Sequence, residues 1–225
     1  MKKVCAGCLT LGLMLSAAMA KSGTGGFGGF GPTLGFVNFS GINTPLKNQG
    51  FNELDALHWG MGGAGYAFVR SVVIGGSGWS GTQTVANDSV RCQVLIGGGQ
   101  FEAGYVLYGS KHLIVAPMLG IGGAAYTITL EPTGGDVPNF EELLRDPGRK
   151  SDVSFSSFAF VPELAVTVPI SFVGLQLKAG YNFLPVPPAW KLSDNARLHK
   201  GPAVSNGFPF VSLNIILGGM GREQD

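Results

Sequence analysis

Three charged residues interrupt segments that are otherwise apolar or rich in glycine. Glu102, Glu163 and Lys178 each lie on the polar side of a segment in which apolar and polar residues alternate. Two carboxylates beside an ammonium group could form an acid–base pair or line a narrow polar conduit. They could equally form an internal salt-bridge network that makes a water-poor interior tolerable, and we favour this structural interpretation. Gln176 and Asn182 share the polar side of their segment with Lys178 and belong to the same expected interior network.

Other combinations of reactive residues give no support for catalysis. His58, His112 and His199 are scattered, and none has zinc-binding spacing with another His or Cys. Residues 60–65 match the G-x-G-x-x-G dinucleotide fingerprint and residues 120–125 nearly do, but both continue into aromatic, strand-like sequence instead of a helix. There is no Gly-x-Ser-x-Gly nucleophile elbow. We therefore expect no enzymatic activity, no cofactor and no metal site.

Glu163 and Lys178 lie on two long segments with period-two alternation. In residues 155–170 the even positions from 158 onward are apolar with a break at Pro162, and in residues 172–183 the odd positions are apolar. Alternation over ten or more residues predicts long strands with two different faces. A strand that crosses a bilayer needs about 9–11 residues, whereas soluble strands average about 5–6. A tight turn at residues 170–171 would place Glu163 directly opposite Lys178.

The same pattern along the chain predicts an all-β protein. Expected strands are 33–39, 57–69, 72–79, 90–108, 111–130, 155–170, 172–183 and 208–217. Short helices are expected in two of the connections, from residue 43 or 44 to residue 50 and over residues 139–145. The connections read long, short, medium, short, long, short, long, so the short turns fall at one rim. We predict an antiparallel up-and-down β-barrel of about eight strands, with short helices in its long loops.

Composition and the chain ends suggest export. Residues 1–20 combine a basic start, an apolar centre and a small-x-small cleavage site, which is typical of a signal peptide. A Gly-rich leader is expected over residues 21–31, the barrel domain over 32–220 and a polar tail over 221–225. Only 13% of residues are charged and the formal net charge is +1, so nothing indicates nucleic-acid binding.

The chain resembles the small eight-stranded bacterial outer-membrane β-barrel proteins, and among them a Gly-rich, signal-bearing group. The likeness is carried by residues 25–31, 40–43, 46–54, 74–79, 162–163 and 210–219. It implies an outer-membrane location, the lipid bilayer as environment, and a structural or surface-interaction role with a surface or envelope partner that the sequence does not name. The C-terminus departs from the family, whose members typically end on an aromatic residue, because this chain ends on Asp225.

An alternative uses the same strands with their faces inverted. A secreted or periplasmic barrel that binds an apolar ligand, like the lipocalins, would turn its apolar face inward. Leu175, Leu177 and Tyr181 would then point into the barrel, and Lys178 would be solvated. In an outer-membrane barrel these three residues face lipid and Lys178 points inward.

Overall fold

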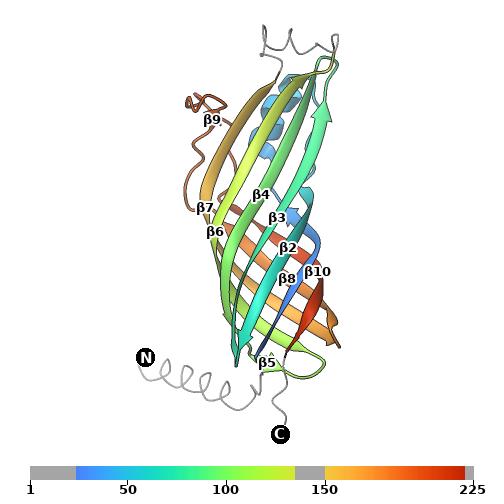
Figure 1. Cartoon of the computed structure of the whole chain (residues 1–225). Helices are drawn as coiled ribbons and strands as arrows, with labels where there is room; N and C mark the ends of the chain where they lie inside the picture. Colours follow the sequence, from blue (N-terminus) through green and yellow to red (C-terminus); the bar gives the residue numbers. More distant parts are fainter. Residues whose placement is uncertain (1–23, 135–149, 221–225) are drawn as a thin grey trace, which may run out of the picture.

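The alternating segments form eight long antiparallel strands, which confirms the predicted fold class (Figure 1). The computed structural model describes residues 24–134 and 150–220. The long strands are β1 (Gly25–Phe36), β2 (Leu57–Val69), β3 (Val72–Ala86), β4 (Val90–Tyr105), β6 (Ile114–Pro132), β7 (Ser151–Ile170), β8 (Val173–Phe183) and β10 (Gly207–Met220). Smaller elements are helix α2 (Ser40–Asn48) and the two-residue strands β5 (Tyr108–Gly109) and β9 (Lys191–Leu192). Within the described residues, no helix is long and apolar enough to cross a membrane.

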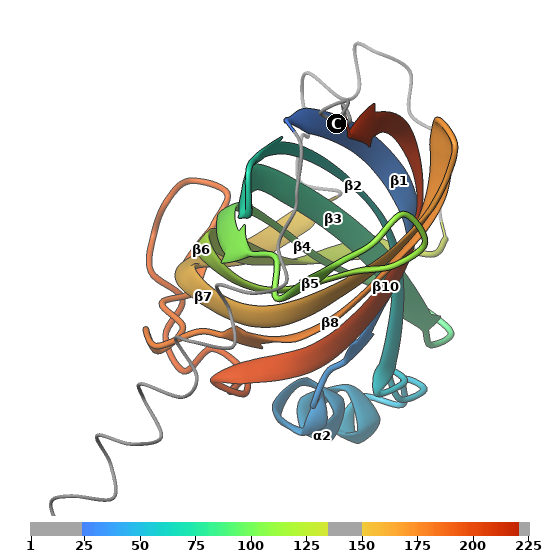
Figure 2. The ribbon, with the colours of Figure 1, turned by 90° about the horizontal axis from the view of Figure 1, so that it is seen from below.

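The eight long strands close into a ring. Their order is β6–β4–β3–β2–β1–β10–β8–β7, and pairing between β7 and β6 completes the circle. The first and last strands lie side by side because β1 pairs with β10. Figure 2 shows the ring from below. A closed sheet leaves no row of unpaired backbone groups along an open edge.

The first strand begins earlier than predicted. Residues 25–31 were expected to be part of a flexible leader, but they form the first half of β1 and pair with both β2 and β10. Glycine is suited to this place because the neighbouring backbone comes very close, and a side chain at Gly31 would collide with the carbonyl of Leu213. The expected signal peptide, the polar tail and the predicted helix over residues 139–145 lie outside the described residues.

The connections at the two rims follow the predicted lengths in most places, but the tight turn expected between strands 90–108 and 111–130 is the longer connection 106–113, which includes β5. The turns at residues 70–71, 106–113 and 171–172 share one rim with the start of β1 and the end of β10 (Figure 1). The opposite rim carries the connections at residues 37–56, 87–89, 133–150 and 184–206. The medium loop expected at residues 81–89 is shorter, because residues 82–86 continue β3 by pairing with residues 91–95 of β4.

The predicted register of the β7–β8 hairpin is wrong by two residues. Its turn is Ser171–Phe172, so Ile170 pairs with Val173, and Ser171 adopts a positive φ of 63°. Consequently Glu163 lies opposite Gly180, and the residue opposite Lys178 is Ala165. Because the side-chain period of a strand is two residues, a shift of two leaves every side chain on its predicted face.

Outward-facing side chains divide the barrel into two parts. In the part that we call the belt, all eight strands are paired and their outward positions are apolar, as at Phe30, Phe101, Leu164 and Leu177. Above the belt, β3, β4, β6 and β7 run on past the other strands (Figure 1). We call this part the extension; it comprises residues 80–86, 90–96, 126–132 and 151–157.

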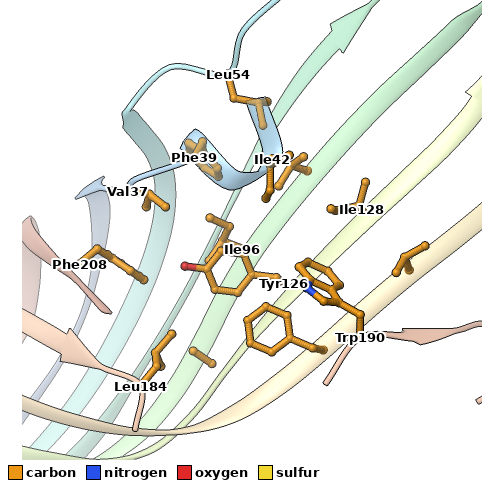
Figure 3. Packing of buried hydrophobic residues seen from close by; sticks show 14 of the residues in the cluster. Val37, Phe39, Ile42, Leu54, Ile96, Tyr126, Ile128, Leu184, Trp190 and Phe208 are labelled. Atoms are coloured by element: carbon orange, nitrogen blue, oxygen red, sulfur yellow. The ribbon is translucent and has the colours of Figure 1, made fainter. Parts of the chain in front are cut away.

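Two apolar clusters fill the ends of the barrel. The larger lies inside the extension, where Phe39, Ile42 and Leu54 from the α2 connection pack toward Ile96, Tyr126 and Ile128 (Figure 3). The Phe155 ring stacks on Tyr126 at 5.0 Å and meets the Trp190 ring at 4.7 Å. The smaller cluster, near the short turns, comprises Tyr66, Phe68, Val73, Val106, Ile114, Ala116, Met118 and Ala165.

Candidate functional site

The strongest candidate site is a buried charged cluster between the two apolar ends. Its centre is the carboxylate of Glu102, which points inward from β4 and is fully buried. The Tyr66 hydroxyl on β2 and the Ser77 hydroxyl on β3 donate hydrogen bonds to this carboxylate. The Gln100 side-chain amide donates a further hydrogen bond at 2.7 Å.

Lys178 reaches Glu102 from the other side of the barrel. Its Nζ donates to both Glu102 carboxylate oxygens at 3.0 Å and to the Tyr66 hydroxyl oxygen at 2.8 Å. The same Nζ lies 3.0 Å from Glu163 Oε1, which forms an ion pair on the β7 side. Strand order places β8 and β4 on different walls of the ring, so this one ammonium group ties two walls together.

The structure thus brings together three of the five predicted network residues. Gln176 and Asn182 are also buried and point inward, but they make no hydrogen bond to the charged groups within the described part of the chain. Gln176 instead donates to the Thr167 hydroxyl at 3.3 Å. These two residues therefore line the same interior without belonging to the cluster.

Charge and access limit what the cluster can do chemically. Two carboxylates face one ammonium group, so a neutral cluster needs one carboxyl proton. The adjoining cavity has a volume of about 20 Å³, with Thr33, Ser77, Gln100, Lys178, Ser212 and Asn214 in its lining. That volume suits a single water molecule and no larger substrate. The arrangement fits a salt-bridge network that holds strands together better than an acid–base pair acting on a substrate.

Tyr66 and Ser77 belong to the cluster, although sequence reasoning did not select them. Both side chains point inward from glycine-rich strands. The sequence feature that could have marked them was a polar residue on the inner face of its strand. One glycine in these strands has a clear structural role: a side chain at Gly75 would collide with Tyr66. Trp59, an aromatic residue beside Gly60 on the same strand, instead points outward and is 56% exposed.

The remaining sequence motifs do not converge on a second site. Residues 60–65 lie within β2 with no helix after them, and residues 120–125 lie within β6. His58 is buried beside the Phe39 and Trp79 rings, whereas His112 and His199 are exposed. Among residues 24–134 and 150–220, no group of three His, Cys, Asp or Glu side chains could hold a metal ion.

A surface groove beside α2 is the other concave feature. It has a volume of about 770 Å³ and lies between the helix and residues 53–56. Several of its polar groups already bind one another: the Asn43 amide exchanges two hydrogen bonds with the Leu54 backbone, and Lys47 pairs with Glu53 at 2.9 Å. These contacts fold the connection back onto α2.

Comparison with known proteins supports the fold and nothing finer. No protein-family model matches the sequence, and no curated protein is significantly similar to it. The crystal structure of Ail, the attachment invasion locus protein of Yersinia pestis, aligns with a TM-score of 0.50 and 10% identity over 88% of this chain and 98% of Ail. A major outer membrane protein from Thermus thermophilus aligns with a TM-score of 0.50 and 10% identity over 87% of this chain and 99% of that protein. The chain therefore has the fold of small outer-membrane β-barrels, and its kinship to a particular Gly-rich group stays a prediction.

Proposed function

We propose that this protein is an outer-membrane barrel with a structural or surface-interaction role and no catalytic activity. The observation that carries the proposal is the apolar outer surface of the belt, which surrounds a charged interior. Phe30, Phe101 and Ile170 are 57%, 60% and 61% exposed, respectively. Soluble proteins rarely expose contiguous apolar surface on this scale.

The outward positions of the belt are uniformly compatible with lipid. On the described strands they carry no Asp, Glu, Lys or Arg, from Phe36 and Leu57 at the upper edge to Ile170 and Leu217 at the lower edge. On β7 the belt runs from Phe158 to Ile170. At about 3.3 Å per residue and a tilt of about 40°, this length gives a height of about 30 Å. That height is comparable with the roughly 30 Å hydrocarbon core of a bilayer.

The lipocalin-like alternative requires the opposite orientation. It would place Leu177 in the interior and Lys178 in water. Instead Leu177 is 46% exposed and Lys178 is 2% exposed. Two clusters of buried apolar side chains occupy the interior, and the cavity beside Lys178, at about 20 Å³, is too small for an apolar ligand.

A surface role is supported by the asymmetry of the rims. The connections that carry α2 and β9 gather at the rim away from the start of β1 and the end of β10 (Figure 1). Loops on a rigid barrel are suited to recognition because they tolerate variation without disturbing the scaffold. One of the similar structures, Ail, is described as an attachment invasion locus protein, and a comparable surface role here would rest on these loops.

Cysteine labelling in native membranes tests the lipid-facing assignment. Leu177→Cys places a thiol in the belt, and Ser154→Cys places one on the same outward side of the extension. Both are made in a Cys92→Ala background, since Cys92 is buried and is the one cysteine of the described residues. A water-soluble maleimide should label Ser154→Cys and spare Leu177→Cys until the membrane is dissolved and the protein unfolded. Equally rapid labelling of both variants in intact membranes would refute the proposal.

A further inference from the structure

The connection from β8 to β10 carries a small hairpin rich in cations. Leu192 N donates to Ala196 O at 2.8 Å, and Leu198 N donates to Trp190 O at 2.8 Å. Lys191, Arg197 and Lys200 are all exposed on this hairpin or directly after it. The acidic side chain at its tip, Asp194, accepts a hydrogen bond from Ala196 N. The segment therefore presents an excess of positive charge at the upper rim.

Two of these cations are held directly opposite each other. Lys191 and Arg197 form an antiparallel bridge pair, and like charges in this position destabilise a sheet. Neither makes an ion pair with an acidic side chain of residues 24–134 or 150–220. A fixed pair of facing cations with no acidic partner in the described part of the chain is an arrangement that an anion would stabilise.

The hairpin is anchored firmly enough to hold this arrangement. The Trp190 side chain is 2% exposed, contacts the Phe155 ring and donates from its indole N–H to Pro202 O at 2.7 Å. Strand β9 also pairs with β7 at residues 153 and 154. The cations are thus held fixed against the extension.

Strand register sets the direction and height of the cations. Lys191 pairs with Ser154, which faces outward, so Lys191 and its partner Arg197 lie on the outer side of the sheet. Four residues below Ser154 on β7, Phe158 begins the belt. Allowing for strand tilt, the backbone of these cations lies about 10 Å above the apolar edge. The headgroup layer reaches about 5–8 Å above the hydrocarbon core, within range of side chains as long as those of lysine and arginine.

We propose that Lys191 and Arg197, assisted by Lys200, bind the phosphate groups of lipid headgroups beside the barrel. The inference rests on the proposed membrane location. Arginine offers a planar fork for phosphate oxygens and lysine a compact point charge. Asp152, which lies two residues before Ser154 on the same face of β7, is already engaged by Lys150 at 3.7 Å and by the Thr129 hydroxyl, so it leaves the two cations available.

A matched pair of double variants tests the assignment. Lys191→Gln/Arg197→Gln removes the facing cations. Arg91→Gln/Lys111→Gln is the control, because it also removes one exposed arginine and one exposed lysine. Arg91 lies opposite Glu131, and Lys111 lies at the other rim. Binding of phosphatidic acid and of phosphatidylcholine with the same acyl chains is measured by native mass spectrometry on the folded protein in detergent micelles.

The wild type should prefer phosphatidic acid, and the Lys191→Gln/Arg197→Gln variant should bind it roughly thirtyfold more weakly. The control should retain nearly all of the affinity. An equal loss in both variants, or equal binding of the two lipids by the wild type, would overturn the inference. Displacement of the lipid by an equal concentration of inorganic phosphate would also overturn the inference, because the site would then select a free anion.

Insertion of each protein into bilayers is scored separately, from the change in gel mobility on heating. A wild type that fails to insert would refute the proposed function. A wild type that inserts but shows no phosphate preference would refute the lipid site alone.

Discussion

The belt and the extension distribute polarity in opposite ways along the same strands. On β7, the extension has Ser154 and Ser156 outside and Phe155 inside, whereas the belt has Leu164 outside and Glu163 inside. Strand β4 changes in the same manner. Its outward side passes from Arg91 and Gln93 to Phe101 and Ala103, while its inward side passes from Cys92, Val94 and Ile96 to Gln100 and Glu102.

This reversal of polarity indicates which medium, water or lipid, surrounds each part of a strand. The extension resembles a water-soluble domain, because it hides Tyr126 and Phe155 behind α2 and exposes hydroxyl and amide side chains. Hydrophobic burial can stabilise it. In the belt, lipid removes that advantage for outward side chains, so stability depends on the closed backbone ladder and on satisfied polar groups inside.

Removing the central cation of the belt is the change with the largest expected effect. Lys178→Met leaves Glu102 and Glu163 together in the interior without an ammonium group. Loss of one partner from a buried ion pair typically costs about 3–5 kcal/mol. We expect the free energy of unfolding in lipid vesicles, measured by urea titration, to fall by about this amount.

Glu163→Gln provides the contrasting measurement within the same cluster. It removes one of the two carboxylates and leaves Lys178 bound to Glu102 at 3.0 Å, so it should change stability by less than about 1 kcal/mol. If Lys178→Met were equally mild, the cluster would contribute nothing to the strength of the barrel.

Arginine substitutions on the outer face should distinguish the two solvents directly. Leu164→Arg places a charge on the lipid side of the belt, where a cation near the bilayer midplane costs about 2–4 kcal/mol. Ser154→Arg places the same side chain on the same face of the same strand, but in the extension, and should cost less than about 0.5 kcal/mol. Urea titration in vesicles measures both. Similar costs for the two variants would mean that the belt and the extension share one solvent.

Strand identity and facing were predictable because both depend on local alternation. The hairpin of β7 and β8 shows how robust this signal is: the turn was misplaced by one residue and the register by two, yet Glu163 and Lys178 still point inward. The length of the rim connections likewise followed from the spacing of the strands. A membrane barrel favours such prediction because every strand repeats the same two-faced pattern.

Long-range contacts set the features that sequence reasoning missed. Residues 25–31 looked flexible because nothing local reveals that β2 and β10 pack against both sides of them. Tyr66 and Ser77 meet Glu102 only after three strands have been aligned. The position of α2 over the upper mouth depends on contacts of Phe39 and Ile42 with distant strands. A period-two pattern contains no information on any of these pairings.

The smallest expected effect concerns an ion pair in the water-exposed part of the molecule. Lys47 and Glu53 pair at 2.9 Å, but their side chains are 73% and 56% exposed, whereas the side chains of Lys178 and Glu102 are 3% and 0% exposed. The hydrogen bond and the charge of Glu53 raise the pKa of Lys47 above 10.5. A raised pKa in the folded state contributes stability below pH 10.5, and this is lost as the pH rises through the folded-state value.

Glu53→Gln should therefore lower the pKa of Lys47 toward its ordinary value, which is measurable by NMR titration of the lysine side chain. The unfolding midpoint at neutral pH should stay unchanged, since exposed ion pairs are screened by solvent and contribute little. A clear drop in that midpoint would show that the pair clamps the α2 connection in place. The stability of the upper mouth would then depend on an ion pair as strongly as that of the belt does. The contrast between the water-exposed region and the belt would not hold for the α2 connection.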